Sequence, residues 1–126
     1  MNKKAPLTVV ILTHNEEIHI ERCIRSLLLI AAKIFIVDSF STDNTVEIAK
    51  SLGAEVEQRK WKNYADQFQW GLDNCGADSE WVMRMDADEY LEPDLLEELP
   101  QALSDVNNEV TGFYIRRKVF FYGKWI

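Results

Sequence analysis

Two nearly uninterrupted apolar runs, at residues 7–12 and 34–37, most constrain what this chain can fold into. Runs of this kind are typical of strands that are covered on both faces, as in a parallel sheet. Between them, apolar residues recur at spacings of three and four, which indicates an amphipathic helix. The first 38 residues therefore predict a strand, a helix and a second strand. The helical positions are Ile20, Ile24, Leu27, Leu28 and Ala31.

The same alternation continues to about residue 105. Residues 45–52 predict a short helix that Gly53 closes, and residues 54–58 a weaker strand at a sheet edge. A helix follows at 63–72, with Tyr64, Ala65, Phe68 and Leu72 on one face, then a strand at 80–86 and a helix that begins at Pro93. The expected fold class is α/β: a Rossmann-like, mostly parallel sheet with helices on both faces.

We expect one domain over residues 1–126, with an α/β core at 1–105. Residues 111–122 (TGFYIRRKVFFY) are β-prone and aromatic, and the chain stops at Trp125-Ile126 without a cap or a polar tail. Residues 106–126 are therefore expected to begin a further half of a larger protein.

Composition excludes several classes of protein. A chain of 126 residues that is 47% hydrophobic can bury one core, and a net charge of −7 argues against a binder of nucleic acid or anionic membranes. No stretch approaches the roughly 20 apolar residues that span a bilayer, so we expect a soluble protein without a transmembrane segment. Cys23 and Cys75 fit no metal or disulfide pattern, and we expect reduced thiols.

Glycine placement excludes two ways of binding phosphate. The five glycines, at 53, 71, 76, 112 and 123, form neither GxGxxG nor GxxxxGK[ST]. The chain therefore has no Rossmann dinucleotide fingerprint and no P-loop, and a phosphate ligand would have to be held in another way.

Polar residues follow each of the four predicted strands, at 13–17, 38–45, 59–62 and 86–89. In an open parallel sheet, ligands bind beyond the carboxyl ends of the strands. Two of these ends are anionic and one is cationic, which suits a ligand with both hydroxyls and phosphates. The sequence thus predicts a polar binding crevice at this edge.

Asp86 and Asp88 can place two hard oxygen ligands near one point, which suits Mg²⁺ or Mn²⁺ on a diphosphate. The alternative is a solvated turn, since an isolated Asp-x-Asp is common. Asp38 has two readings as well: a turn residue that bonds its own backbone, or a carboxylate that accepts hydrogen bonds from a base or ribose. Thr13 and Glu16 match a capping box, and Asp43 with Thr45 match the cap of the next helix.

Three segments together resemble a known family. They are TVVILTHNE, ending at Glu16; IVDS with STDNT, from Ile36 to Thr45; and WVMRMDADE, ending at Glu89. In order and spacing the chain is similar to the inverting nucleotide-sugar glycosyltransferases of family 2, which have the GT-A fold. Residues 62–71 (KNYADQFQWG) and the ending FYGKW resemble the branch that adds glucose to the lipopolysaccharide core.

The resemblance implies roles for seven residues. Asp88 would be the metal ligand, with Mg²⁺ or Mn²⁺ as the divalent cation. Asp38 would meet the uracil or ribose, and Asp86 would approach the ribose or the sugar. The residues implied to bind the nucleotide-sugar are Thr13, Asn15, Glu16, Asp38, Ser39 and Asp86.

The resemblance implies transfer of a sugar, expected to be glucose, from a UDP-sugar to a hydroxyl of a glycan or lipid-linked saccharide, with inversion. It places the family's catalytic base beyond Ile126, so we assign none and expect this chain to bind donor but to transfer little. It also implies a cytoplasmic protein at the inner membrane. The sequence does not identify the oligomeric state.

Two other functions remain open from the residues alone. One is a non-catalytic nucleotide-binding or protein-interaction module. The other is a sugar-nucleotide pyrophosphorylase, which the absence of glycine after the first strand disfavours. Arg84 departs from the apolar character of its predicted strand, and either points into the crevice or pairs with a nearby carboxylate. We expect Trp61, Trp70 and Trp81 to pack in the core or between helix and sheet, and not to serve as platforms for a sugar.

The negative charge is concentrated in one segment. Residues 86–98 carry seven acids and no Lys or Arg, while the rest of the chain has 14 acids and 14 bases. The whole excess therefore lies at the predicted cation site and at the start of the next helix, where the helix dipole favours acids.

Overall fold

A computed structural model of the chain describes residues 5–76, 81–104, 120–121 and 124–125. Within these residues a four-stranded sheet has the order β3-β2-β1-β4, and all its pairs are parallel. This arrangement confirms the predicted parallel sheet and the edge position of the third strand. The strands are β1 (Ala5–Thr13), β2 (Ala31–Asp38), β3 (Glu55–Gln58) and β4 (Trp81–Asp86).

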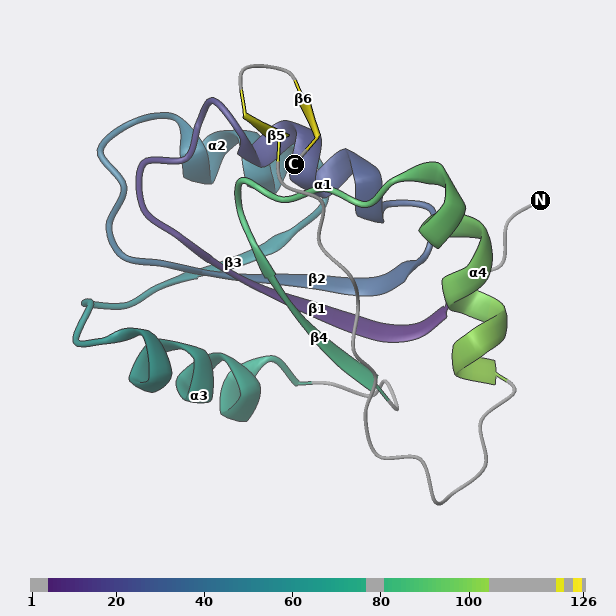
Figure 1. Cartoon of the computed structure of the whole chain (residues 1–126). Coiled ribbons are helices and arrows are strands. Elements are labelled where there is room, and N and C mark those ends of the chain that lie inside the picture. The colour runs from purple at the N-terminus through teal and green to yellow at the C-terminus, as the bar shows by residue number, and fades with distance from the viewer. Residues whose placement is uncertain (1–4, 77–80, 105–119, 122–123, 126) are drawn as a thin grey trace.

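Helices cover both faces of the sheet, as expected for the fold class (Figure 1). The helices α1, α2 and α4 lie on one face and α3 on the other. Their bounds are Ile20–Leu27 for α1, Thr45–Ser51 for α2, Tyr64–Asn74 for α3 and Pro93–Ser104 for α4. Pro93 begins α4 as predicted, and Gly53 follows α2 with a φ of 95°.

The end of the chain is described only in part. Two short strands, β5 (Phe120–Phe121) and β6 (Lys124–Trp125), pair antiparallel. Most of the predicted β-prone stretch at 111–122 lies outside the described residues. The predicted division between residues 1–105 and 106–126 therefore stays a prediction.

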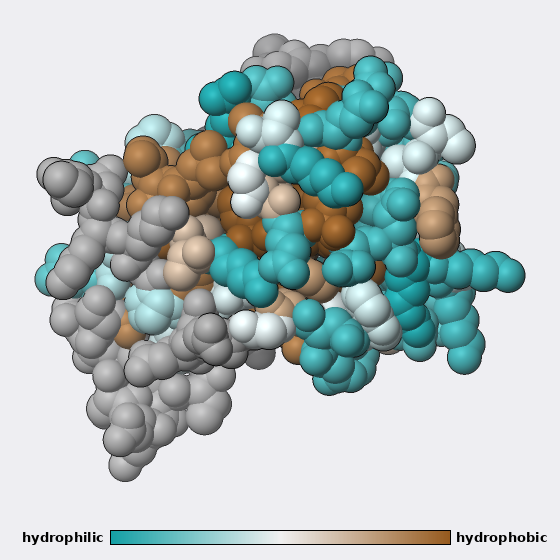
Figure 2. Space-filling model, turned by 180° about the vertical axis from the view of Figure 1, so that it is seen from behind, coloured by the Kyte–Doolittle hydropathy of each residue, from teal (hydrophilic) through white to brown (hydrophobic). Residues whose placement is uncertain are grey.

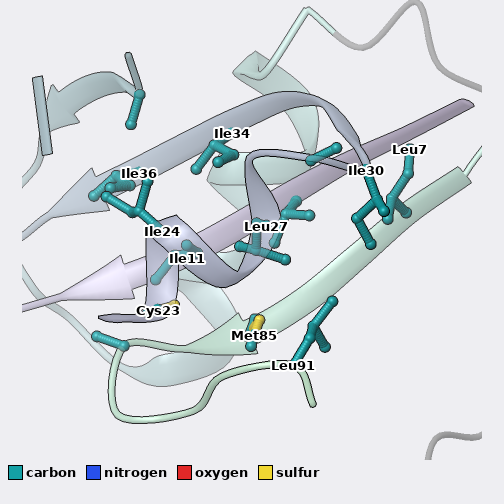
Figure 3. Close-up of a cluster of buried hydrophobic side chains, with 14 of the residues drawn as sticks. Leu7, Ile11, Cys23, Ile24, Leu27, Ile30, Ile34, Ile36, Met85 and Leu91 are labelled. Atoms are coloured by element: carbon teal, nitrogen blue, oxygen red, sulfur yellow. The ribbon is translucent and has the colours of Figure 1, made fainter. Parts of the chain in front are cut away.

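The larger part of the core lies between the sheet and the helices α1, α2 and α4. Side chains of α1 meet those of the central strands, and Cys23 lies close to Met85 (Figure 3). Ile11, Ile24 and Leu27 are completely buried. Because alternate strand residues point to opposite faces, this packing fixes which residues of β1 and β2 face α3 instead.

Helix α1 is shorter than its apolar spacing predicts. It ends at Leu27, Leu28 is 36% exposed, and Ala31 is already the first residue of β2, where it pairs with Ala5. A turn in which the amide of Ile30 donates to the carbonyl of Leu27 makes the change of direction. The need to reach the start of β2 therefore overrides the helical pattern at its last two positions.

The buried face of α3 also differs from the prediction. Gln67 and Gly71 are the buried positions, whereas Tyr64 and Ala65 are exposed. Gly71 lets the helix approach the sheet closely, since a Cβ there would lie 2.9 Å from Val10 Cγ1 and 3.2 Å from Val37 Cγ2. Gln67 is satisfied by Arg59, whose carbonyl accepts from Nε2 and whose guanidinium donates to Oε1.

We expect Gly71→Val to lower the free energy of unfolding by about 3 kcal/mol, because Val10 and Val37 are fully buried and cannot yield to an added side chain. Urea unfolding followed by circular dichroism measures the change. Gln69→Val, at an exposed position of the same helix, serves as control and should cost no more than about 0.7 kcal/mol of helix propensity. Equal losses in the two variants would contradict the close packing at Gly71.

Three further features of the structure can be compared with the sequence predictions. No helix within the described ranges is long and apolar enough to cross a membrane. Cys23 and Cys75 are buried free thiols, as predicted. Trp70 stacks on Phe35 at 6.4 Å and Trp81 packs against the larger core. Trp61 is 47% exposed, so its predicted packing in the core or between helix and sheet is wrong.

Candidate functional site

The candidate site lies at the carboxyl ends of the strands, on the left in Figure 1. Strand β1 has β2 on one side and β4 on the other, so the strand order reverses there, and the crevice outside such a switch point is where open α/β sheets bind ligands. Thr13 pairs in register with Asp38, and Leu12 with Asp86. The backbone therefore brings the ends of β1, β2 and β4 to one level. Figure 2 shows the molecule from behind, so the edge with the strand ends lies on the right. This side is mainly hydrophilic, whereas apolar side chains gather in the middle of the view.

Asp38 is fully enclosed at this edge, with no exposed surface. Its Oδ1 accepts from Thr13 Oγ1 at 2.6 Å and from Ser41 Oγ at 2.5 Å. Its Oδ2 accepts from the Ser41 amide at 2.8 Å and from Gln58 Nε2 at 3.1 Å. Both oxygens are thus occupied by groups from three segments, which makes Asp38 the centre of the local structure.

The surroundings of Asp38 favour its charged form. Burial alone would raise the pKa of this carboxyl, but the hydrogen bonds from Ser41, Thr13 and Gln58 together outweigh burial and hold the pKa below its ordinary value of 3.8. Asp38 is therefore an anion at neutral pH. The structure confirms that Asp38 accepts a hydrogen bond from the backbone of its own turn, at the Ser41 amide. Its contact with a base or ribose stays a prediction.

The loops after β1 and β2 are joined by many hydrogen bonds. Asn15 has a left-handed φ of 53°; its amide donates to Ser41 Oγ at 2.8 Å, and its Oδ1 accepts from the Thr42 amide at 2.8 Å. The Glu16 amide donates to Thr45 Oγ1 at 2.8 Å. The Ser39 amide donates to the Thr13 carbonyl at 2.9 Å, which joins the starts of the two loops. The two loops therefore form one structural unit.

The predicted capping box at Thr13 and Glu16 is wrong. Thr13 is the last residue of β1, and its hydroxyl donates to Asp38 instead of to a helix amide. Helix α1 begins later, with His19 as N-cap and no side-chain capping bond, and Glu16 Oε2 lies 3.2 Å from His19 Nδ1. Because Thr13 pairs with Asp38 at the ends of β1 and β2, it is part of the sheet and cannot cap a helix.

The predicted helix-start role of Asp43 agrees with the structure. Its Oδ1 accepts from the Thr45 amide at 2.9 Å, at the first residue of α2, while Asn44 is the N-cap and makes no side-chain capping bond. The amide of Glu17 donates to Asp43 Oδ2 at 3.2 Å. Asp43 thus serves α2 and the neighbouring loop together.

Asp86 and Asp88 lie on the other side of β1, in a tight turn. The Asp86 amide donates to Glu89 Oε1 at 2.9 Å, and the Glu89 amide donates to the Asp86 carbonyl at 3.0 Å. Arg22 of α1 holds the same turn: its Nη2 donates to the Asp88 carbonyl at 3.3 Å, and its guanidinium lies 4.3 Å from the centre of the Tyr90 ring. The Asp88 side chain is exposed, so it is accessible to a ligand.

The carboxylates of this turn also act on a neighbouring buried thiol, Cys23. Burial, followed by the charges of Glu89 and Asp88, raises the pKa of Cys23 to about 12. Carboxylates so arranged favour a cation nearby.

Arg84 lies on the α3 face of β4, where its contacts among the described residues are with aromatic rings; that it points into the crevice stays a prediction. Its guanidinium lies 4.8 Å from the centre of the Tyr64 ring and 6.0 Å from that of Phe68. Tyr64 in turn donates its hydroxyl to Asp86 Oδ1 at 2.9 Å. Burial and this hydrogen bond raise the pKa of Tyr64 to about 12, so the phenol stays protonated and remains a donor.

The basic loop after β3 is partly structural. Arg59 Nη1 lies 2.5 Å from Asp66 Oδ2, and its guanidinium lies 5.6 Å from the Trp70 ring. The hydrogen bond from Arg59 lowers the pKa of Asp66. Lys60 and Lys62 are exposed.

The described side chains fit a metal that shares its ligands with a substrate. No group of three or more His, Cys, Asp or Glu side chains that could hold an ion occurs among the described residues. The exposed carboxylate of Asp88 is a hard oxygen donor, and Mg²⁺ commonly binds through one or two carboxylates plus substrate phosphates. This donor set thus fits a divalent cation together with a diphosphate.

Sequence comparison gives the family of the chain. The family model described as "Glycosyl transferase family 2" matches residues 8–125. The chain is also 36% identical over 128 residues to the lipopolysaccharide core biosynthesis glycosyltransferase LpsC of Rhizobium meliloti (98% of this chain, 46% of LpsC). A glycosyltransferase of Rickettsia bellii is 39% identical over 103 residues (82% of this chain, 34% of that protein). The chain belongs to glycosyltransferase family 2.

Solved structures agree with this fold. Glucosyl-3-phosphoglycerate synthase of Mycobacterium tuberculosis, in complex with Mn²⁺, UDP and glucosyl-3-phosphoglycerate, superposes with a TM-score of 0.57 at 22% identity. The match covers 67% of this chain and 35% of that one. The chain thus spans less than half the length of these relatives.

The structure collects the sequence-predicted residues into two groups. Thr13, Asn15, Glu16, Asp38 and Ser39 lie in the joined loops after β1 and β2, and Asp86 and Asp88 lie in the turn after β4. Sequence reasoning missed the structural roles of Gln58, Arg22 and Tyr64, because each acts on a segment distant in sequence and no local motif marks it.

Proposed function

We propose that this chain forms the donor-binding part of a glycosyltransferase that moves a sugar, expected to be glucose, from a UDP-sugar to a hydroxyl of a glycan or lipid-linked acceptor with inversion. The observation that carries the proposal is the meeting of two polar units at the β1 switch point: the loops joined around Asp38, and the turn that presents Asp86 and Asp88. The family membership and the UDP complexes of the structural neighbour support the same donor.

The joined loops would hold the nucleotide. Asn15, Glu16 and Ser39 lie at the accessible surface of this unit, with Asn15 exposed and the other two half-buried. Thr13 and Asp38 are buried beneath them, so under this proposal they act by fixing the loop shape as well as by any contact of their own. A pocket preorganised in this way spends less of its binding energy on ordering loops.

The turn after β4 would serve the diphosphate and the sugar. Asp88 would hold a divalent cation, Mg²⁺ or Mn²⁺, and Asp86 would face the ribose or sugar. A cation at this place supplies electrostatic stabilisation of the negative charge that grows on the leaving diphosphate. Asp88 contributes an exposed carboxylate to it, and the hydrogen bonds of Glu89 and Arg22 keep the turn in shape.

We assign no catalytic base within the chain. An inverting transfer needs a group that takes the acceptor proton, and we expect that group to lie beyond Ile126. The similarity to LpsC supports an acceptor of the lipopolysaccharide-core class. Work at the cytoplasmic face of the inner membrane is part of the same proposal.

The proposal predicts Mn²⁺-dependent binding of UDP by the 126-residue chain. Isothermal titration calorimetry with UDP, with and without Mn²⁺, should show affinity at least about tenfold higher with the metal, because the cation and the diphosphate complete each other's coordination. ADP under the same conditions serves as the control for base recognition and should bind more weakly. UDP binding that is equally tight in the presence of EDTA would overturn the metal assignment, and absence of binding would overturn the donor assignment.

A further inference from the structure

One residue outside the sequence-predicted set contacts Asp86 directly. Tyr64 Oη donates a hydrogen bond of 2.9 Å to Asp86 Oδ1. Tyr64 is the first residue of α3 and Asp86 is the last residue of β4, so the bond joins the start of α3 to the carboxyl end of β4. Among the described residues no donor is recorded for the other oxygen, Oδ2. One oxygen of this carboxylate is thus held by the protein and the other is left for a ligand.

The Tyr64 ring is itself held in place. The side chain of Asn63 caps α3 by accepting from the Asp66 amide at 2.8 Å, which fixes the backbone at the start of the helix. The Arg84 guanidinium covers the ring at 4.8 Å, and Trp61 meets it edge-on at 6.3 Å. A donor whose ring has two neighbours and whose backbone begins a capped helix can restrain the Asp86 carboxylate instead of merely following it.

Arg84 contributes to this arrangement by packing on the Tyr64 ring. Arg84 is exposed on β4, two residues before Asp86, and its recorded contacts within the described residues are with the rings of Tyr64 and Phe68. A cation over the face of an aromatic ring stabilises the ring's position. Arg84, Tyr64 and Asp86 thus form a chain of contacts that ends on the free carboxylate oxygen.

We propose that Tyr64 is a positioning residue that orients the carboxylate of Asp86 toward the ribose and sugar of the donor. Its hydroxyl holds Oδ1, and Oδ2 then faces the crevice ready to accept a hydrogen bond from a ligand hydroxyl. The inference rests on the proposed function, since it concerns the same donor. Partner residues of this kind lower the cost of ordering a binding group and commonly change affinity by about 10- to 100-fold.

Tyr64→Phe tests the proposal, because it removes only the hydroxyl and leaves the ring under Arg84. We expect the Kd for UDP in the presence of Mn²⁺ to rise about tenfold in calorimetric titration of the 126-residue chain. The same substitution in an Asp86→Ala background should change the Kd by less than about twofold, because alanine offers no oxygen for the Tyr64 hydroxyl to hold, and a residue that acts through Asp86 then loses its effect.

Tyr90→Phe is the matched control. Tyr90 is 40% exposed against 37% for Tyr64, and its recorded contact is through the ring, with Arg22. Its loss of a hydroxyl should leave the Kd within about twofold of the wild type. A Tyr64→Phe variant that binds UDP as the wild type does, or that loses the same factor in the Asp86→Ala background, would overturn the proposal. A wild-type chain without Mn²⁺-dependent binding would overturn the proposed function itself, and the inference with it.

Discussion

Asp88→Asn is expected to weaken Mn²⁺-dependent binding of UDP by on the order of 100-fold, because it removes the exposed carboxylate that would carry the cation while keeping the size of the side chain. Binding of UDP in EDTA should not change, since the joined loops after β1 and β2 are left intact. Calorimetric titration with and without Mn²⁺ measures both quantities.

Asp94→Asn separates a ligand effect from a charge effect. Asp94 is exposed in the first turn of α4, within the same acidic segment, and its substitution removes the same charge. The Kd of the Asp94→Asn variant for UDP with Mn²⁺ should stay within about twofold of the wild type, because the charge of an exposed side chain that does not coordinate the metal is largely screened by salt. Equal losses in Asp88→Asn and Asp94→Asn would show that overall charge, and not coordination by Asp88, attracts the metal.

Asp38→Ala is expected to lower the free energy of unfolding by about 3 kcal/mol at pH 7. The substitution leaves four donors without their acceptor, and the buried hydroxyl of Thr13 and the half-buried hydroxyl and amide of Ser41 carry the cost, since a buried donor without a partner costs roughly 1–3 kcal/mol. The fourth donor, the exposed Gln58 amide group, can bond water instead. Urea unfolding measures the loss. Asp73→Ala, on the exposed surface of α3, is the control and should cost no more than about 0.5 kcal/mol.

The loss in Asp38→Ala should depend on pH in a definite direction. The folded state lowers the pKa of Asp38 below 3.8, so its ionisation stabilises the fold fully above that value. As the pH falls below about 4 toward the lower pKa of the folded state, this contribution disappears. The difference between wild type and variant should therefore shrink at acid pH, and a difference that is the same at pH 7 and pH 3 would contradict the role of the charge.

The sequence predicted the sheet well because its signal is repeated in every element. The apolar runs that become β1 and β2 are uninterrupted because both faces of these strands are buried, and the sequence shows this directly. The charged residues directly after each strand mark the point where the chain leaves the buried sheet. For the same reason the sequence alone places Asp38, Asp86 and Asp88 at one edge of the sheet, where parallel strands end together.

The errors have a common physical cause. Thr13 fits a capping box locally, yet its hydroxyl bonds Asp38, 25 residues away, because the two strand ends pair in register. Gln67 breaks the apolar pattern of α3 and is nonetheless fully buried, since Arg59 satisfies its amide. Contacts between side chains that are distant in sequence leave no trace in spacing, so such roles appear only when the elements are assembled.

The hydrogen bonds between the loops after β1 and β2 divide the site into a rigid and an adjustable part. The loop amides of Asn15, Glu16 and Thr42 are each fixed by a partner in the opposite loop, whereas Asp88 is exposed in its short turn. Under the proposed function, residues near Asp88 can vary through evolution to accept a different sugar without lowering the affinity for the nucleotide, which the joined loops bind. One donor-binding frame of this kind could therefore be inherited by enzymes with many specificities.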